Sequence, residues 1–294
     1  MREFKDAAAL LPMRINSEML VLPDSISGKC EEIRLRTGYP ISLVYDGKEH
    51  EIIDDYEICR DDIDAVLEKA SGASIHSVES SIARGFMYVE GGIRLGLCGT
   101  AVNKENGLAG LRELSSVAIR IPHEITNCGS GLFKELISDG LRDIIVISPP
   151  GAGKTTCLRE YIRIVSNMGY RISLVDERGE IAGIKDGVPQ FDIGRHTDVM
   201  QNLPKREASI LMLRAMNPQL IAMDEVSSPE DIKAIEEISG CGVTILASAH
   251  AKDVKDLTKR PVYRELIESR IFKYAIVIEN NAGNRTYHAE ELCL

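Results

Sequence analysis

The chain has no tryptophan, and its aromatic content is only 5%. Single-stranded nucleic acids are held largely by stacking of bases on aromatic rings, so this composition offers little material for such a surface. Positive charge is also scarce, with 35 lysines and arginines against 45 acidic residues and a formal net charge of -10. Because an acidic protein repels phosphate backbones, we expect no nucleic acid among its partners.

Paired cysteines and long apolar runs are missing as well. The seven cysteines occur singly, without a C-x-x-C pair or the ligand spacing of a zinc site, so reduced thiols are expected. No run approaches the roughly 18 apolar residues of a transmembrane helix, and residues 1–6 lack the apolar stretch of a secretory signal. These absences predict a cytoplasmic protein, with any membrane association peripheral and made through a protein partner.

The apolar sequence that is present suffices for two folded domains, since 44% of the 294 residues are hydrophobic. Residues 1–125 are predicted to form a smaller α+β N-terminal domain and linker. The elements expected there are a helical segment over residues 7–20, strands near 32–36, 41–45, 85–90 and 92–97, and a helix near 60–71. In residues 126–294 strands alternate with helices, which predicts an α/β fold with a mostly parallel central sheet.

A phosphate-binding loop follows the apolar run 143–147 and opens a helical pattern. Such a loop presents backbone N–H groups and a helix N-terminus to an anion. Lys154 is expected to reach the β- and γ-phosphates, and the Thr155 hydroxyl is expected to bind Mg²⁺. The predicted nucleotide-binding residues are Ser148, Pro149, Pro150, Gly151, Ala152, Gly153, Lys154, Thr155 and Thr156. Ser148 departs from the usual G-x-x-x-x-G-K-[ST] pattern, in which the first position is glycine.

Polar residues follow three further apolar runs, at Asp176-Glu177, Asp224-Glu225 and His250. The carboxyl ends of parallel strands meet at one edge of a sheet, so these side chains are expected near the loop. The apolar run ending in Asp224-Glu225 has the form of a Walker B element. We assign Asp224 to the metal and Glu225 to the attacking water. His250 either contacts the γ-phosphate or caps the following helix.

The order of these elements resembles the type II/IV secretion ATPase superfamily. The similarity rests on the segment 213–218 (LRAMNP) leading to residues 220–225, on an aspartate box at Asp176-Glu177 and on a histidine box at residues 248–251. The resemblance implies a RecA-like P-loop ATPase domain that uses ATP and Mg²⁺ and assembles into a homo-oligomer, expected to be a hexamer. It also implies catalytic roles for Glu225, Glu177 and His250.

A closer resemblance, over nearly the whole chain, is to the stage III sporulation protein AA family. It rests on residues 32–40 (EIRLRTGYP), 176–182 (DERGEIA) and 224–226 (DEV). Members of that family are cytoplasmic ATPases of the mother cell in spore-forming bacteria, thought to energise a membrane channel complex between mother cell and forespore. The resemblance therefore implies membrane-protein components of such a complex as partners. Ser148 and His196 stand where glycine and arginine are expected. These two departures are expected to affect the turnover rate and a contact between subunits rather than the class of activity.

Three arginines, Arg94, Arg112 and Arg120, lie on the approach to the linker. In the superfamily, arginines of the N-terminal domain or linker complete a neighbouring nucleotide site, so the resemblance makes these three the candidates. An arginine in this role stabilises charge on the transferring phosphate and couples hydrolysis to rigid-body motion. The alternative for each is a surface arginine or one held in a salt bridge.

Other functions remain open at this point. A nucleotide-dependent nucleic-acid-binding ATPase shares the same core and is distinguished by salt-dependent affinity for DNA or RNA. A nucleotide-binding scaffold without a transport role would bind ATP without turnover. A small-molecule kinase would need an arginine-rich lid, for which Arg178, Arg195 and Arg206 are the candidates.

Overall fold

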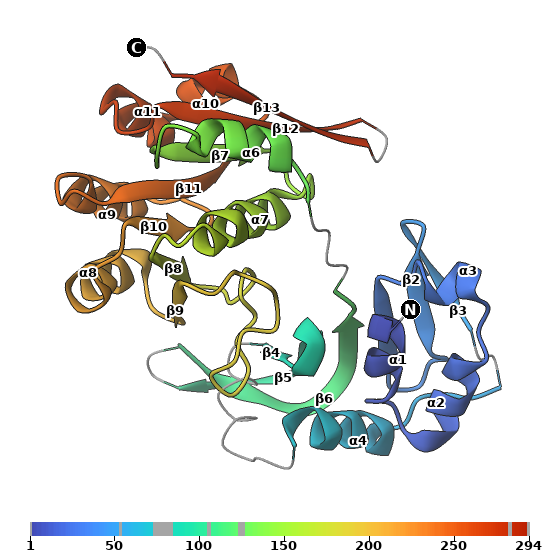
Figure 1. Ribbon diagram of the computed structural model, residues 1–294. Coiled ribbons are helices and arrows are strands. Elements are labelled where there is room, and N and C mark those ends of the chain that lie inside the picture. Colours follow the sequence, from blue (N-terminus) through green and yellow to red (C-terminus); the bar gives the residue numbers. More distant parts are fainter. Residues whose placement is uncertain are drawn as a thin grey trace. The chain divides into compact units, whose positions relative to one another are not determined.

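The computed structural model describes residues 2–52, 55–72, 85–104, 107–122, 127–281 and 284–292. The chain forms two compact units. Unit 1 comprises Met1–His123 together with Lys185–Gln190, and unit 2 comprises Glu124–Ile184 and Phe191–Leu294. The excursion Lys185–Gln190 was not anticipated by the predicted division into residues 1–125 and 126–294. Each unit has its own sheet, and the mixed α/β class is confirmed (Figure 1).

Unit 1 is built on a six-stranded sheet in the order β3-β2-β1-β6-β5-β4, with antiparallel neighbours throughout. Its strands are β1 (Glu32–Arg36), β2 (Ser42–Tyr45), β3 (Lys48–Glu51), β4 (Phe86–Tyr88), β5 (Arg94–Lys104) and β6 (Gly107–Arg120). Its helices are α1 (Arg2–Ala8), α2 (Met13–Leu20), α3 (Asp24–Ser27), α4 (Arg60–Ser71) and the short 3-10 helix η1 (Glu90–Gly92). Strand β1 alternates between faces: Ile33 and Leu35 are fully buried in the core, while Arg34 lies on the opposite face.

The helical segment predicted over residues 7–20 is divided in two. Helix α1 ends at Ala8 and α2 begins at Met13, directly after Pro12. Proline lacks a backbone N–H and disfavours helical geometry in the residue before it, so one helix cannot run through this position. Pro12 instead precedes the first turn of α2 with an extended ψ of 147°.

Unit 2 is built on a seven-stranded sheet in the order β13-β12-β7-β11-β10-β8-β9. All neighbours are parallel except the antiparallel pair β12 and β13. Its strands are β7 (Ile144–Ser148), β8 (Ile172–Asp176), β9 (Thr197–Gln201), β10 (Leu220–Met223), β11 (Thr244–His250), β12 (Tyr274–Asn281) and β13 (Asn284–Glu291). Its helices are α6 (Ser130–Ile137), α7 (Lys154–Asn167), α8 (Lys205–Met216), α9 (Pro229–Ser239), α10 (Val254–Lys259) and α11 (Pro261–Glu268).

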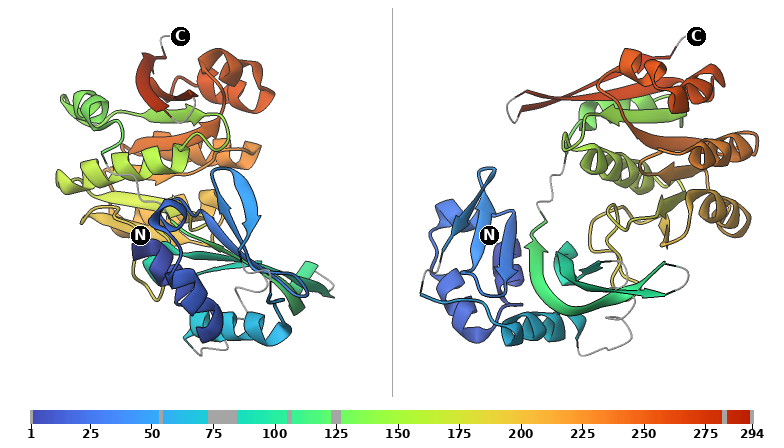
Figure 2. Two further views of the ribbon diagram at one scale, coloured as in Figure 1. Left: turned by 90° about the vertical axis from the view of Figure 1, so that its right-hand side faces the viewer. Right: turned by 180° about the vertical axis from the view of Figure 1, so that it is seen from behind.

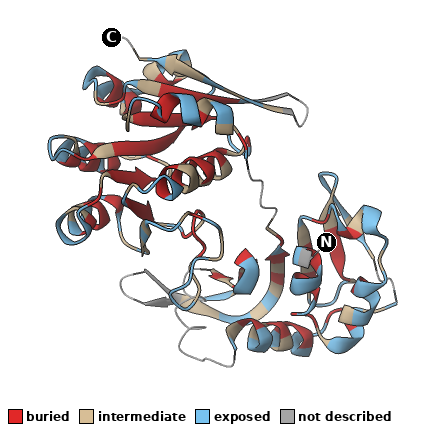
Figure 3. Cartoon of the chain, in the orientation of Figure 1, coloured by how far each residue is buried: buried red, intermediate tan, exposed pale blue. Residues whose placement is uncertain are grey.

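The continuous apolar character of β7 reflects a sheet covered on both faces (Figures 2 and 3). Ile144 and Val146 pack in one core cluster, with residues of α6 and α7, whereas Ile145 and Ile147 pack in the other, with residues of α8, α9 and α11. A strand buried on both sides has no polar face to show in its sequence. The carboxyl ends of β7, β8, β10 and β11 lie at the same edge of the sheet, where ligands of such folds bind.

Among the helices that the structure describes, none has the length and apolarity needed to cross a membrane.

Candidate nucleotide-binding site

The loop between β7 and α7 turns at two glycines with left-handed backbone geometry. Gly151 has a φ of +74° and Gly153, the residue before the first turn of α7, has a φ of +101°. A side chain is disfavoured at such angles. At Gly153 an added Cβ would also lie 3.0 Å from the Arg285 guanidinium carbon. The glycine therefore allows Arg285 of β13 to lie against the loop, a contact that sequence reasoning missed.

Lys154 begins α7 and points to the strand end of β11. Its side chain is 6% exposed, and its Nζ lies 3.1 Å from Nδ1 of His250. Burial lowers the pKa of Lys154, while nearby Asp224 and Glu225 oppose that shift. The register places His250 directly beside Ser148, the last residue of β7. His250 therefore lies at the predicted phosphate-binding loop.

The end of β10 is held in place by a serine of β11. Ser248 Oγ donates to Asp224 Oδ1 at 2.5 Å and accepts a hydrogen bond from the backbone N–H of Glu225 at 2.9 Å. The other carboxylate oxygen of Asp224 lies 3.5 Å from Thr155 Oγ1. These contacts aim Asp224 at the first turn of α7. The sequence placed Ser248 in the histidine box without indicating that its hydroxyl links both residues of the Walker B pair.

Glu225 adopts a left-handed backbone conformation with a φ of +44°, which is uncommon for a residue with a side chain. Its carboxylate accepts a hydrogen bond from Arg178 Nη1 at 2.5 Å and lies 3.6 Å from Nε2 of His250. Strained backbone of this kind concentrates at functional sites. Glu225 thus contacts Arg178 and His250 at the cavity that Lys154 also lines.

These side chains surround one cavity of about 380 Å³ within unit 2. Its lining residues are Pro149, Pro150, Gly151, Gly153, Lys154, Thr155, Arg178, Glu180, Asp224, Glu225 and His250. Nine of these were predicted from the sequence as site residues; Arg178 was named only as a candidate for the lid of a kinase, and Glu180 was not among the predicted site residues. Predicted residues Ser148, Ala152, Thr156 and Glu177 do not line the cavity, and Ser148 and Ala152 are buried.

The pair Asp176-Glu177 has other partners. The carboxylate of Asp176 is buried and accepts hydrogen bonds from the backbone N–H groups of Ile181 (3.2 Å) and Ala182 (2.9 Å). Burial raises the pKa of Asp176, and these hydrogen bonds oppose the shift. Glu177 accepts a hydrogen bond from Lys205 Nζ at 2.6 Å. Asp176 therefore stabilises the turn that contains Ile181 and Ala182. Glu177 is paired with a lysine, and its position does not support the predicted catalytic role.

A divalent cation fits the cavity as a partly hydrated ion. In the described ranges no group of three or more His, Cys, Asp or Glu side chains has the arrangement of a metal site. Thr155 Oγ1 and Asp224 Oδ2 are nevertheless two hard oxygen donors at the loop. Mg²⁺ keeps several waters and is usually bound by one or two protein oxygens together with substrate phosphates. The donor set therefore suits Mg²⁺ with a bound nucleotide and does not suit a fully protein-enclosed metal.

The two departures from the family pattern have structural partners. The hydroxyl of Ser148 donates to the carbonyl of Pro149 at 3.0 Å. His196 contacts the C-terminal end of α7. Its ring Nδ1 lies 2.8 Å from the carbonyl oxygen of Ser166, and its backbone N–H donates to Ser166 Oγ at 2.7 Å. Neither side chain lines the cavity.

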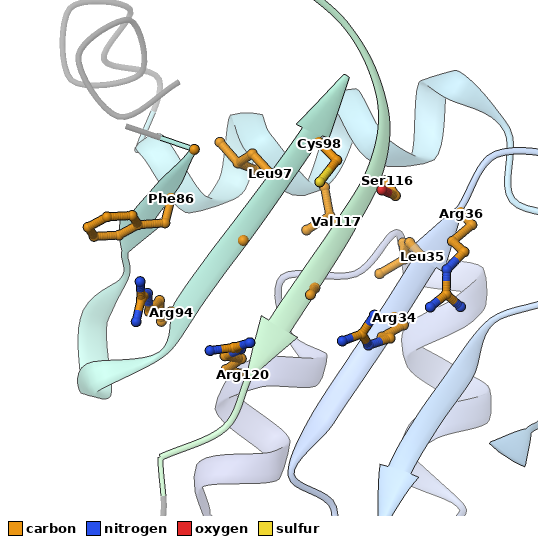
Figure 4. Close-up of a pocket in the computed structure, with 13 residues that line it drawn as sticks. Arg34, Leu35, Arg36, Phe86, Arg94, Leu97, Cys98, Ser116, Val117 and Arg120 are labelled. Carbon is orange, nitrogen blue, oxygen red and sulfur yellow. The ribbon is translucent and has the colours of Figure 1, made fainter. Parts of the chain in front are cut away.

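The candidate arginines belong to unit 1, where Arg94 and Arg120 line a second cavity of about 400 Å³ with Arg34 and Arg36 (Figure 4). Small residues of β5 and β6, among them Gly96, Ser116 and Ala118, also line this cavity. Arg120 pairs with Glu32 at 3.0 Å, and Arg94 lies over the Phe86 ring at 4.2 Å.

Arg112 is separated from that cavity: it is exposed on β6 and pairs in the ladder with Thr100. Arg36 forms an ion pair with Glu49, and this contact lowers the pKa of Glu49 to about 2. The salt-bridge alternative therefore holds for Arg120 in this structure, and two further arginines of the cavity, Arg34 and Arg36, are also ion-paired.

The kinase alternative required an arginine-rich lid. Arg178 lines the nucleotide cavity, but Arg206 pairs with Glu237 on α9, and Arg195 is outside the cavity. The three candidates do not assemble around the site.

The fold places the chain in the class of proteins with the secretion-ATPase fold. The ATPase DotB of Legionella pneumophila superposes with a TM-score of 0.59 and 17% identity, over 89% of this chain and 76% of DotB. The pilus retraction motor PilT, solved with bound ADP, gives a TM-score of 0.60 and 16% identity, over 88% of this chain and 78% of PilT.

Within that class, the sequence identifies the family. The family model described as "Sporulation stage III, protein AA" matches residues 6–288. Stage III sporulation protein AA of Bacillus subtilis (strain 168) is 31% identical over 286 residues, which are 96% of this chain and 92% of that protein. The chain belongs to the Sporulation stage III, protein AA family, which confirms the family resemblance drawn from its motifs.

Proposed function

We propose that the chain is an Mg²⁺-dependent ATPase that works as a homo-oligomeric motor in sporulation. The observation that carries this proposal is the convergence of Lys154, Thr155, Asp224, Glu225 and His250 on one cavity at the carboxyl edge of a parallel sheet. In this arrangement the phosphate-binding groups and the candidate water-positioning carboxylate face the same space. Phosphoryl transfer needs such positioning and charge stabilisation far more than covalent chemistry.

Each residue has a distinct proposed role. The loop 148–156 holds the phosphates through its N–H groups and the N-terminus of α7, and Lys154 contributes the positive charge at the β- and γ-phosphates. Thr155 and Asp224 hold Mg²⁺, which supplies charge neutralisation on the phosphate oxygens when it is bound. Glu225 orients the attacking water, and His250 contacts the γ-phosphate.

Charge explains why the cation is needed. The cavity is lined by two basic side chains, those of Lys154 and Arg178, and by three carboxylates, those of Glu180, Asp224 and Glu225. A bare triphosphate would meet repulsion from the carboxylates. A divalent cation makes the net charge of the cavity positive. We therefore expect nucleotide binding to be weak without Mg²⁺.

The proposed biological role is supported by the family and the fold together. A Sporulation stage III protein with the fold of DotB and PilT is proposed to form a ring, expected to be a hexamer, that energises a channel complex between mother cell and forespore. Its proposed location is cytoplasmic and peripheral to the membrane, through contact with membrane-protein components of that complex. Arg94 and Arg112 are proposed to contact the nucleotide of a second copy of the chain in the assembled ring, and Arg120 would do so only after leaving its ion pair with Glu32.

The test combines turnover with mass in solution. ATP hydrolysis by the wild-type protein and by the Glu225→Gln variant is measured with Mg²⁺, while light scattering records the mass with and without nucleotide. Turnover that is lost in the variant, with an ATP-dependent rise in mass, supports the motor. A stable monomer that binds ATP but never hydrolyses it, even with membrane partners present, would favour a nucleotide-binding scaffold.

A further inference from the structure

Arg178 lies at the tip of a turn that is fixed from two sides. Inside the turn, the buried carboxylate of Asp176 accepts the backbone N–H groups of Ile181 and Ala182. Outside it, Arg159 of α7 donates from Nε to the carbonyl of Ile181 at 2.7 Å. Because α7 also begins with the phosphate-binding lysine, these contacts attach the turn to the same helix that would hold the nucleotide. The position of the Arg178 backbone is therefore set relative to the phosphate site.

The side chain of Arg178 remains accessible although its backbone is fixed. It is 59% exposed, whereas its partner Glu225 is 22% exposed. The guanidinium bonds to Glu225 through Nη1, and it lines the same cavity as Lys154. An exposed ion pair is worth little energy, so a stronger anion in this cavity can take the guanidinium from the carboxylate at small cost.

Building on the proposed ATPase function, we propose that Arg178 recognises the γ-phosphate and controls Glu225. The guanidinium leaves the Glu225 carboxylate and pairs with the γ-phosphate of ATP, a dianionic group whose oxygens match its planar set of donors. Glu225 is then free to accept a hydrogen bond from the attacking water. ADP lacks the γ-phosphate and leaves the Arg178–Glu225 pair intact. The exchange makes the water-positioning carboxylate available only when ATP is bound.

The experiment measures binding as well as turnover, on the full chain with Mg²⁺. Dissociation constants for ADP and for a non-hydrolysable ATP analogue are determined by calorimetry for wild type, Arg178→Ala, Glu225→Gln and the double variant. We expect Arg178→Ala to weaken analogue binding about tenfold and to change ADP binding less than about twofold, since only the γ-phosphate contact is lost. Arg178→Lys, which keeps the charge, is expected to recover part of the analogue affinity.

The double variant tests the exchange itself. Glu225→Gln removes the competing carboxylate, so in the presence of Arg178 it is expected to strengthen analogue binding about threefold or more. In the Arg178→Ala background the same substitution is expected to have a smaller effect, because it only relieves the repulsion between this carboxylate and the phosphates and no guanidinium remains to be released. A purely structural arginine would not produce this dependence.

Arg206→Ala is the matched control. Arg206 is 55% exposed and forms an ion pair with Glu237 in the same unit, away from the cavity. Its replacement is expected to leave both dissociation constants unchanged. Analogue and ADP affinities that fall equally in Arg178→Ala, or an unchanged analogue affinity, would overturn the role of Arg178 alone. Failure of the wild-type protein to bind either nucleotide would instead overturn the proposed ATPase function.

Discussion

Two acidic pairs follow two neighbouring strands of unit 2, and they are alike in sequence but not in structure. Asp176-Glu177 follows the apolar run of β8, and Asp224-Glu225 follows that of β10. The first aspartate is enclosed by backbone N–H groups, while the second is held by a serine hydroxyl and approaches Thr155. A carboxylate whose oxygens are occupied by buried donors is a structural group, whereas one left facing a cavity is available for chemistry.

Each pair also has its own buried lysine. Lys154 is 6% exposed and faces the nucleotide cavity, and Lys205 is 8% exposed and bonds to Glu177. Lys205 additionally lies 3.6 Å from Asp231, so it has two carboxylates to neutralise it. Lys154 lies 3.1 Å from Nδ1 of His250, and burial lowers its pKa. A buried lysine without a direct carboxylate partner among the described residues, such as Lys154, is suited to binding an anion. A buried lysine paired with two carboxylates, such as Lys205, is suited to stabilising the fold.

Exchanging the two lysines for alanine gives the largest expected contrast. Lys154→Ala is expected to weaken ATP binding by about 100-fold or more while the protein stays folded, because the main positive charge at the phosphates is lost. Lys205→Ala is expected to keep ATP affinity and to lower the free energy of unfolding by about 3 kcal/mol, since two carboxylates lose their partner. Calorimetric titration and denaturant unfolding of both variants measure the contrast. Equal ATP binding by the two variants would contradict it.

The glutamates give the next contrast. Glu225→Gln is expected to retain nucleotide binding and to lose turnover by about 100-fold, because an amide cannot orient the water as a carboxylate does. Glu177→Gln is expected to retain turnover within about twofold, since its carboxylate contacts Lys205 outside the cavity. Steady-state ATP hydrolysis at saturating Mg²⁺ and ATP decides between them. If Glu177→Gln loses turnover as strongly, the catalytic role predicted from the family resemblance stands and our interpretation of its position fails.

The sequence predicted more of unit 2 than of unit 1, for physical reasons. Buried parallel strands are continuous apolar runs, and their polar residues fall at one sheet edge, so nine residues lining the cavity were found in advance. The strand β6 (Gly107–Arg120) was missed because its apolar residues do not form a continuous run. Arg178 and Arg285 were not recognised as neighbours of the loop, because their positions depend on a hydrogen-bonded turn and on a strand pairing distant in sequence.

Asp176→Asn tests the structural half of the comparison. The amide keeps one acceptor oxygen but turns a donor toward backbone N–H groups, so we expect the free energy of unfolding to fall by about 1–3 kcal/mol. The pH dependence has a definite sign. Burial raises the pKa of Asp176 in the folded state above its value in the unfolded state, so protonation of this carboxylate favours folding. The resulting contribution to the free energy of unfolding is fully present below the unfolded-state pKa and is lost as the pH rises through the folded-state pKa.

The stability difference between wild type and Asp176→Asn is therefore expected to grow as the pH is lowered through that window and to level off below the unfolded pKa. Denaturant unfolding at several pH values measures it, with Glu177→Gln as the neighbouring control. A difference that shrinks on acidification would mean that the hydrogen bonds from Ile181 and Ala182 outweigh burial in the folded protein.

Ser248→Ala is expected to have the smallest effect and to act on the other half of the comparison. Its hydroxyl donates to Asp224 and accepts from the Glu225 N–H, so it holds both residues of the pair without lining the cavity. Removing it is expected to lower turnover about tenfold through misplaced carboxylates, while affinity for ADP changes little because Lys154 and the loop remain. Asp176 is held by backbone N–H donors, whereas Asp224 is held by the Ser248 hydroxyl. A loss of turnover in Ser248→Ala at unchanged stability would show that this side-chain hydrogen bond serves catalysis by positioning Asp224 and Glu225. A loss of stability at unchanged turnover would instead mean that Ser248 has a structural role, like the backbone amides around Asp176. The two acidic pairs would then differ only in whether they line the cavity.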